Sequence, residues 1–143
     1  MALHPIHQLI YVSDLVGKDE RQLAPILESA VRRNTEDGIT GMLLYSGGNF
    51  LQVLEGPKDA VQATYDRICK DSRHRNTTLL LEQDITERQF GSWSMGYRQL
   101  SAEDVARFPE HAPYFQFGFK NDALKAKPGE ARELLKLFCD GML

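Results

Sequence analysis

The sequence GITGMLLYSGGNFLQVLEG, residues Gly38 to Gly56, decides the fold of this chain. It contains two apolar runs, Ile39 to Ser46 and Phe50 to Glu55, which have the length and composition of β-strands. Between them lies Gly47-Gly48-Asn49, whose residues readily adopt the positive φ angles of a tight turn. The stretch therefore predicts a β-hairpin.

The segments on either side of the hairpin predict two helices and three more strands. Apolar residues recur at helical spacing from Leu23 to Val31, which puts Arg32 and Arg33 in the last turn of this helix and Gly38 at its end. A second helix is expected from Pro57 to near Asp71, because proline suits the first turn of a helix. The additional strands are His7 to Ser13, Thr77 to Ile85 and Trp93 to Leu100.

The resulting order, βαββαββ, predicts an α+β fold of the ferredoxin-like type. Right-handed crossovers place both helices on one face of a mixed five-stranded sheet. The other face needs cover, and apolar residues at helical spacing from Pro128 to Cys139 can supply it. We therefore expect a domain at residues 1–100 and a C-terminal helical extension at residues 101–143 that covers the sheet and mediates output or assembly.

Composition excludes several classes of partner. The 143 residues include 17 basic and 20 acidic side chains, for a net charge of −3, and no basic run is present, which argues against nucleic acid. No apolar run is long enough to cross a bilayer and no basic leader is present, so we expect a cytoplasmic protein that does not engage a membrane. The four histidines do not cluster, so no metal is expected.

One polar side chain is out of place in the predicted hairpin. Strand alternation puts the amide of Gln52 on an apolar face, where leaving it unpaired would cost about 1–3 kcal/mol. Tyr11 on the first strand can pair with it, and Asn34 near the end of the first helix lies close to the same layer. Either these residues only satisfy one another, or they surround a cavity suited to a planar heterocycle with carbonyl and imide edges, such as a flavin.

Three segments of the chain resemble motifs of the BLUF family of blue-light receptors, in matching order and spacing. They are ILESAVRRNTEDGITGMLLYSGGNFLQVLEGP, DSRHRN and FGSWSMG, and the resemblance covers roughly Gln8 to Leu100. It implies a ferredoxin-like fold with a flavin held non-covalently between the two helices. It also implies a photoactive tyrosine at Tyr11, a switching glutamine at Gln52, and the neighbouring pair Trp93 and Met95. The other implied flavin contacts are Ile26, Asn34, Arg67, Ile68, Asp71, Arg73 and His74.

The resemblance also implies a mechanism. Light drives electron and proton transfer from Tyr11 through Gln52, which then rotates or changes tautomer, strengthens a hydrogen bond to the flavin C4 carbonyl and shifts absorption to the red. The site releases no product, so the chain is not expected to be an enzyme. Arg33 stands where relatives often carry Asn or His, which predicts an altered contact beside Asn34.

The implied cofactor is FAD, with FMN or riboflavin as alternatives, because no dedicated phosphate-binding loop is present. The implied partner is a separate effector, such as a cyclic-nucleotide enzyme or regulator, and a homo-oligomer is expected. Two other functions stay open: a cofactor-free interaction module and a small hydrolase of the acylphosphatase type. The hydrolase requires an arginine after the first strand, and the loop DLVGKDE has none.

Overall fold

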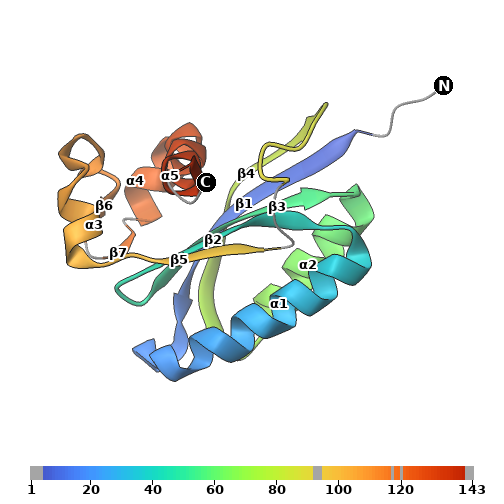
Figure 1. Cartoon of the computed structure of the whole chain (residues 1–143), viewed down its shortest axis with the longest axis horizontal. Coiled ribbons are helices and arrows are strands. Elements are labelled where there is room, and N and C mark those ends of the chain that lie inside the picture. Colours follow the sequence, from blue (N-terminus) through green and yellow to red (C-terminus); the bar gives the residue numbers. More distant parts are fainter. Residues whose placement is uncertain (1–4, 92–94, 117, 120, 141–143) are drawn as a thin grey trace.

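The computed structural model describes residues 5–91, 95–116, 118–119 and 121–140. Its elements alternate between strands and helices through the first hundred residues and become mainly helical afterwards (Figure 1). In chain order they are β1 (Ile6–Leu15), the short 3-10 turns η1 (Val16–Lys18) and η2 (Glu20–Gln22), α1 (Leu23–Asp37), β2 (Thr40–Ser46), β3 (Asn49–Gly56), α2 (Lys58–Lys70), β4 (His74–Ile85), β5 (Gly96–Gln99), α3 (Ala102–Ala106), η3 (Pro109–His111), β6 (Phe115–Gln116), β7 (Gly118–Phe119), α4 (Asn121–Ala126) and α5 (Pro128–Asp140).

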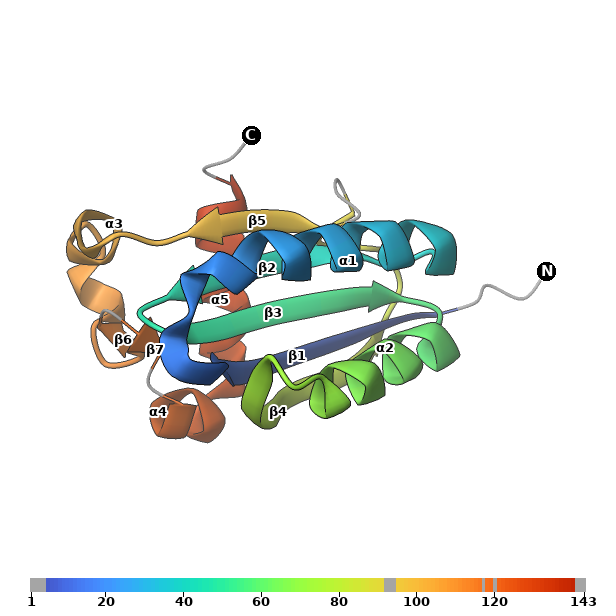
Figure 2. The same cartoon turned by 90° about the horizontal axis from the view of Figure 1, so that it is seen from below.

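The main sheet has the strand order β4-β1-β3-β2-β5. All neighbouring strands are antiparallel except β2 and β5, which are parallel, so the sheet is mixed. Helices α1 and α2 lie side by side on one face, and α5 lies on the other (Figures 1 and 2). The predicted ferredoxin-like arrangement with a C-terminal cover is confirmed.

Two glycine positions shape the part of the fold that carries the site. Gly38 ends α1 in the left-handed conformation, with φ of 72°, and its amide bonds back to the Asn34 carbonyl. Gly47 and Gly48 form the predicted hairpin turn, with φ of 52° and 95°. Positive φ at both central residues gives a turn whose twist matches that of the flanking strands.

The sheet separates two apolar cores, because the central strands are buried on both faces. Along β3, Leu51 and Val53 pack towards α5, whereas Phe50 and Leu54 pack beneath α1 and α2. Gln52 follows the same alternation as Phe50 and Leu54, so its side chain lies under the two helices.

Three expectations about the elements need correction. Helix α1 continues to Asp37, so Arg32 and Arg33 do not lie in its last turn. Strand β4 begins at His74 rather than at Thr77, because it continues to pair with the end of β1. The last strand is predicted from Trp93 to Leu100, its described part runs from Gly96 to Gln99, and residues 93–94 lie outside the described residues. In the described part of the chain, none of the helices combines the length and apolar character needed to cross a bilayer.

Candidate functional site

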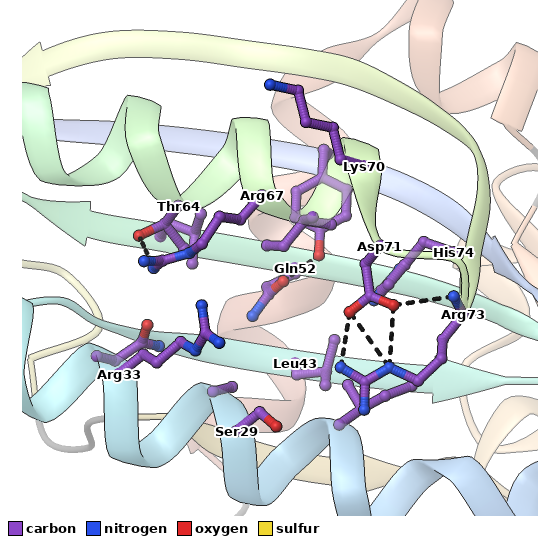
Figure 3. Close-up of a pocket in the computed structure, with 16 residues that line it drawn as sticks. Ser29, Arg33, Leu43, Gln52, Thr64, Arg67, Lys70, Asp71, Arg73 and His74 are labelled. Atoms are coloured by element: carbon purple, nitrogen blue, oxygen red, sulfur yellow. Dashed lines mark hydrogen bonds and ion pairs between the residues drawn. The ribbon is translucent and has the colours of Figure 1, made fainter.

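A cavity of about 260 Å³ lies between α1 and α2, above the middle of the sheet (Figure 3). Its floor comes from β1, β2 and β3, and its walls come from the two helices and the segment after α2. The nine residues predicted to contact a flavin all line it: Tyr11, Ile26, Asn34, Gln52, Arg67, Ile68, Asp71, Arg73 and His74.

The floor of the cavity carries a short chain of hydrogen bonds. Tyr11 and Gln52 are direct partners in the antiparallel β1–β3 register, and the Tyr11 hydroxyl donates to Gln52 Oε1. Gln52 Nε2 in turn donates to Met95 Sδ at 3.3 Å. All three side chains are buried, so both polar ends of the Gln52 amide are engaged inside the protein. Trp93, the other member of the predicted pair, lies outside the described residues.

Burial also keeps the Tyr11 phenol in its protonated form. Loss of solvent raises its pKa well above the usual value of 10.0, and the neighbouring groups Tyr65, Cys69 and Asp71 add to the rise. The Tyr65 ring lies 5.4 Å from the Tyr11 ring, centroid to centroid. At neutral pH Tyr11 is therefore a hydrogen-bond donor, as its bond to Gln52 Oε1 requires.

Asn34 projects from the buried side of α1, one turn before the helix ends, and is 2% exposed. Its backbone carbonyl accepts the amide of Ile39 at 2.9 Å, which ties this turn of α1 to the chain entering β2. Its side-chain amide lines the cavity together with that of Gln52. The cavity therefore offers two primary amides to the edge of a bound ring.

The end of α2 supplies an ordered polar group. The Asp71 carboxylate accepts from the Arg73 amide at 2.9 Å and from Arg73 Nη2 at 2.6 Å, and these bonds to Arg73 lower the pKa of Asp71. Burial lowers the pKa of His74 to about 4, so its imidazole is neutral at pH 7. A hydrogen bond of 2.9 Å joins His74 Nδ1 and Ser13 Oγ, and the Phe50 ring packs 4.9 Å from the His74 ring.

Positive charge surrounds the cavity. Figure 3 shows Arg33 from α1 and Arg67 from α2 at one end, with the Asp71–Arg73 pair at the other. Lys70 is also among the lining residues, so the lining includes four basic side chains and one carboxylate. The net charge of the lining favours an anionic ligand or an anionic tail at the mouth.

The sequence interpretation missed several residues that complete the walls. Leu43 and Leu54 face the cavity from β2 and β3, and strand alternation carries a signal for both because they lie on the helix-covered face. The others lie on the helices: Ser29, Ala30, Thr64 and Lys70. Ala30 belongs to the apolar period of the first predicted helix, whereas the three polar residues carry no such signal.

The residues present fit the flat ring of a flavin. Ile26 and Ile68 provide aliphatic walls from facing helices, a phenol and one amide lie at the floor, and a second amide projects from α1. Ligand pockets usually have about 300–1,000 Å³, so this smaller cavity suits an enclosed ring with its tail outside. The fold and the site together define a cofactor-holding α+β domain.

Comparison with known families makes the assignment specific. Residues 6–96 match BLUF, described as sensors of blue-light using FAD. The chain therefore belongs to the BLUF family and is a flavin-dependent blue-light sensor domain.

Two curated relatives show how such domains are used elsewhere. The photoactivated adenylate cyclase subunit beta-like protein FB of Euglena gracilis is 40% identical over 103 residues, which cover 71% of this chain and 12% of that protein. The blue light- and temperature-regulated antirepressor BluF of Escherichia coli (strain K12) is 34% identical over 123 residues, covering 82% of this chain and 30% of that protein. The chain thus spans less than a third of the length of either relative.

A solved structure supports the fold over almost the whole chain. The dark-state structure of the BLUF protein BlrB has a TM-score of 0.75 and 24% identity, and the match covers 98% of this chain and 99% of that chain. At this identity the likeness concerns the fold alone. It includes the C-terminal region, whose helices cover the second face of the sheet.

Proposed function

We propose that the cavity between α1 and α2 holds FAD non-covalently, with Asn34 and Gln52 at the polar edge of its ring and Ile26 and Ile68 against its faces. The observation that carries the proposal is the buried bond from Tyr11 to Gln52 at the cavity floor. When bound, the flavin supplies absorption of blue light and an acceptor for one electron. The phenol of Tyr11 is the proposed donor of that electron.

The hydrogen bond from Tyr11 determines where its proton goes. An oxidised phenol is strongly acidic, and Gln52 Oε1 is the acceptor already in place. On the other side of the amide, the acceptor of Gln52 Nε2 among the described residues is a thioether sulfur, which is a weak acceptor. The Gln52 amide can therefore break its hydrogen bond to Met95 at little cost in free energy while the proton moves. Return of the electron and the proton restores Tyr11, so the lasting change is the hydrogen-bond pattern of Gln52.

This cycle has no product, so we propose a switch rather than an enzyme. The hydrogen bond between Ser13 and His74 resembles half of a hydrolase site, but Ser13 is fully buried and is not among the cavity-lining residues. It therefore has no access to a substrate in the cavity. The alternative of a cofactor-free interaction module is disfavoured by the cavity itself, whose lining combines two buried amides with aliphatic walls.

Output and assembly form a further part of the proposal. We place the light-sensing unit at residues 1–100 and assign residues 101–143 to covering the sheet and to output or assembly. Helix α5 supports this division, because Leu134, Leu135 and Phe138 pack on the sheet face opposite the cavity. We propose that the signal passes to a separate effector protein, such as a cyclic-nucleotide enzyme or regulator. We also propose that this chain contacts the effector as a homo-oligomer.

Flavin retention tests the cofactor assignment. Protein incubated with FAD in the dark and then desalted is expected to keep an equimolar amount of flavin, because the ring is enclosed between the helices. Denaturation should release it unmodified, which chromatography of the supernatant checks. A protein that stays colourless after incubation with FAD, FMN and riboflavin would show that the cavity is not a flavin site.

Arg33 is expected to favour phosphorylated flavins. It is exposed, lines the cavity and adds positive charge at the mouth. Arg33→Gln should weaken binding of FAD and FMN about two- to fivefold, as for an exposed ion pair, and leave riboflavin binding unchanged. Titration by flavin fluorescence at low and high salt measures this. Arg32→Gln is the matched control, since Arg32 is also exposed on α1 but does not line the cavity. If the two substitutions weakened FAD binding equally, a contact between Arg33 and the phosphates would be refuted.

A further inference from the structure

A fully buried carboxylate lies three residues beyond Gln52 on β3. Glu55 has 0% exposed surface, and strand alternation directs its side chain to the sheet face opposite the cavity. In the sheet register it lies between Gln8 on β1 and Thr40 on β2. A carboxylate in such a position needs hydrogen-bond donors around it. Two of its donors come from the loop between β4 and β5.

Among the described residues, every hydrogen bond to this carboxylate comes from an N–H group. Glu55 Oε1 accepts from the Phe90 amide at 2.7 Å, and Glu55 Oε2 accepts from the Gln89 amide at 3.1 Å. Gln8 Nε2 also donates to Glu55 Oε2, at 2.7 Å. Such charge-assisted bonds are stronger than neutral ones, so the loop backbone is firmly fastened to the end of β3.

Arg88 fastens the same loop a second time. Its Nη1 donates to the Glu55 carbonyl at 2.9 Å and to Thr40 Oγ1 at 2.8 Å, and its Nη2 donates to the Gly38 carbonyl at 2.8 Å. We call Glu55 with Arg88, Gln89 and Phe90 the loop latch. It binds the loop to the two strands of the hairpin and to the residue that ends α1.

The loop latch has two neighbours that bear on the switch, Met95 later in the chain and α5 in the core. Met95, whose sulfur accepts the bond from Gln52, follows Phe90 closely in the chain, and residues 92–94 between them lie outside the described residues. The space for Met95 is tight, because a Cβ atom on Gly41 would lie 3.3 Å from Met95 Cε. In the other direction, Phe90 is buried in the core that contains α5, and Lys136 Nζ lies 5.8 Å from the centroid of its ring.

We propose that the loop latch holds Met95 against Gln52 in the dark and thereby sets how fast the light-induced state decays. Glu55 and Arg88 act as positioning residues, since neither lines the cavity. The inference rests on the proposed function, because it assumes that Gln52 changes its hydrogen bonds in the light. A firm latch resists the movement of Met95 that accompanies any rearrangement of the Gln52 amide, and its release lets both side chains rearrange more easily.

Glu55→Gln tests the loop latch with almost no change of shape. The substitution replaces one of the two carboxylate oxygens by an NH2 group, which faces N–H donors and cannot accept from them. The loop therefore loses at least one hydrogen bond. In FAD-loaded protein, thermal recovery of the dark spectrum after a blue flash is expected to be about tenfold faster, or about 1.4 kcal/mol in the barrier. Flavin content and the size of the red shift should stay unchanged. Arg88→Gln changes a partly exposed site and should also make recovery faster. It takes the place of Glu55→Gln in this test if that variant does not fold.

Two controls separate positioning from general loosening. Glu87→Gln removes an exposed carboxylate from the same loop, and Val12→Ala opens the same apolar core away from the loop. Both should recover as the wild type does. In addition, hydrogen exchange of the Gln89 and Phe90 amides in flavin-free protein should be faster in Glu55→Gln.

The possible outcomes distinguish the latch from the function on which it rests. Wild-type recovery in Glu55→Gln and Arg88→Gln, or equal acceleration in Val12→Ala, would overturn the loop latch alone. A wild-type protein that binds FAD but gives no red shift would overturn the proposed switch itself. In that case the exchange rates of Gln89 and Phe90 would still report whether Glu55 fastens the loop.

Discussion

Tyr11→Phe is expected to abolish the reversible red shift while the flavin stays bound. The substitution removes one oxygen atom, and with it the bond to Gln52 Oε1 and the proposed path of the proton. The cavity walls are unchanged, so flavin content should remain equimolar. Gln52 Oε1 loses its donor in a buried site, so stability should fall by about 1–3 kcal/mol, which leaves the fold intact. The measurement is the light-minus-dark absorption spectrum of the FAD-loaded variant.

Tyr65→Phe provides a matched control for this experiment. Its ring lies 5.4 Å from that of Tyr11 on the neighbouring helix, yet Tyr65 does not line the cavity. The variant should therefore keep the full red shift. Retention of the shift in Tyr11→Phe, or its loss in both variants, would contradict the assignment of Tyr11 as the electron donor.

Gln52→Leu is expected to remove the red shift as completely as Tyr11→Phe, for a different reason. The donor remains, but the amide that receives the proton and changes its bonds is absent. The Tyr11 hydroxyl loses its partner in a fully buried site, so stability should fall by about 1–3 kcal/mol. Thermal unfolding measures this loss, and the light-minus-dark spectrum measures the response.

Gln62→Leu is the control for the loss of an amide. Gln62 lies on the exposed side of α2 and donates to Glu82, away from the cavity. Its substitution should leave both the red shift and flavin binding unchanged. A normal red shift in Gln52→Leu would show that the light-induced state is stored elsewhere, and the proposed mechanism would then be wrong.

Much of the fold could be predicted because its signals are local. The turn at Gly47 and Gly48 and the stop at Gly38 depend on backbone freedom that glycine alone has at low cost. Alternation along β3 placed Gln52 under the helices, and the register with β1 then brought it opposite Tyr11. The turn of α1 that holds Arg32 and Arg33 was less predictable, because the residues between them and Gly38 are mostly exposed and polar and show no apolar period.

The site could be predicted only in part because its remaining members depend on tertiary packing. The charged residue Glu55 ends an apolar run, where sequence alone suggests exposure, yet donors from a distant loop bury it completely. The contact from Gln52 to Met95 depends on the parallel pairing of β5 with β2, which leaves no pattern in the sequence. The short strands β6 and β7 have two residues each, too few to show a period.

The central claim is that light rearranges the hydrogen bonds of Gln52 without consuming the flavin. The light-minus-dark spectrum of the FAD-loaded wild-type protein tests it most directly. The account predicts that blue light shifts the visible flavin absorption to longer wavelength and that the original spectrum returns in the dark. Bleaching of the visible absorption, or an unchanged spectrum in protein that has bound flavin, would contradict it.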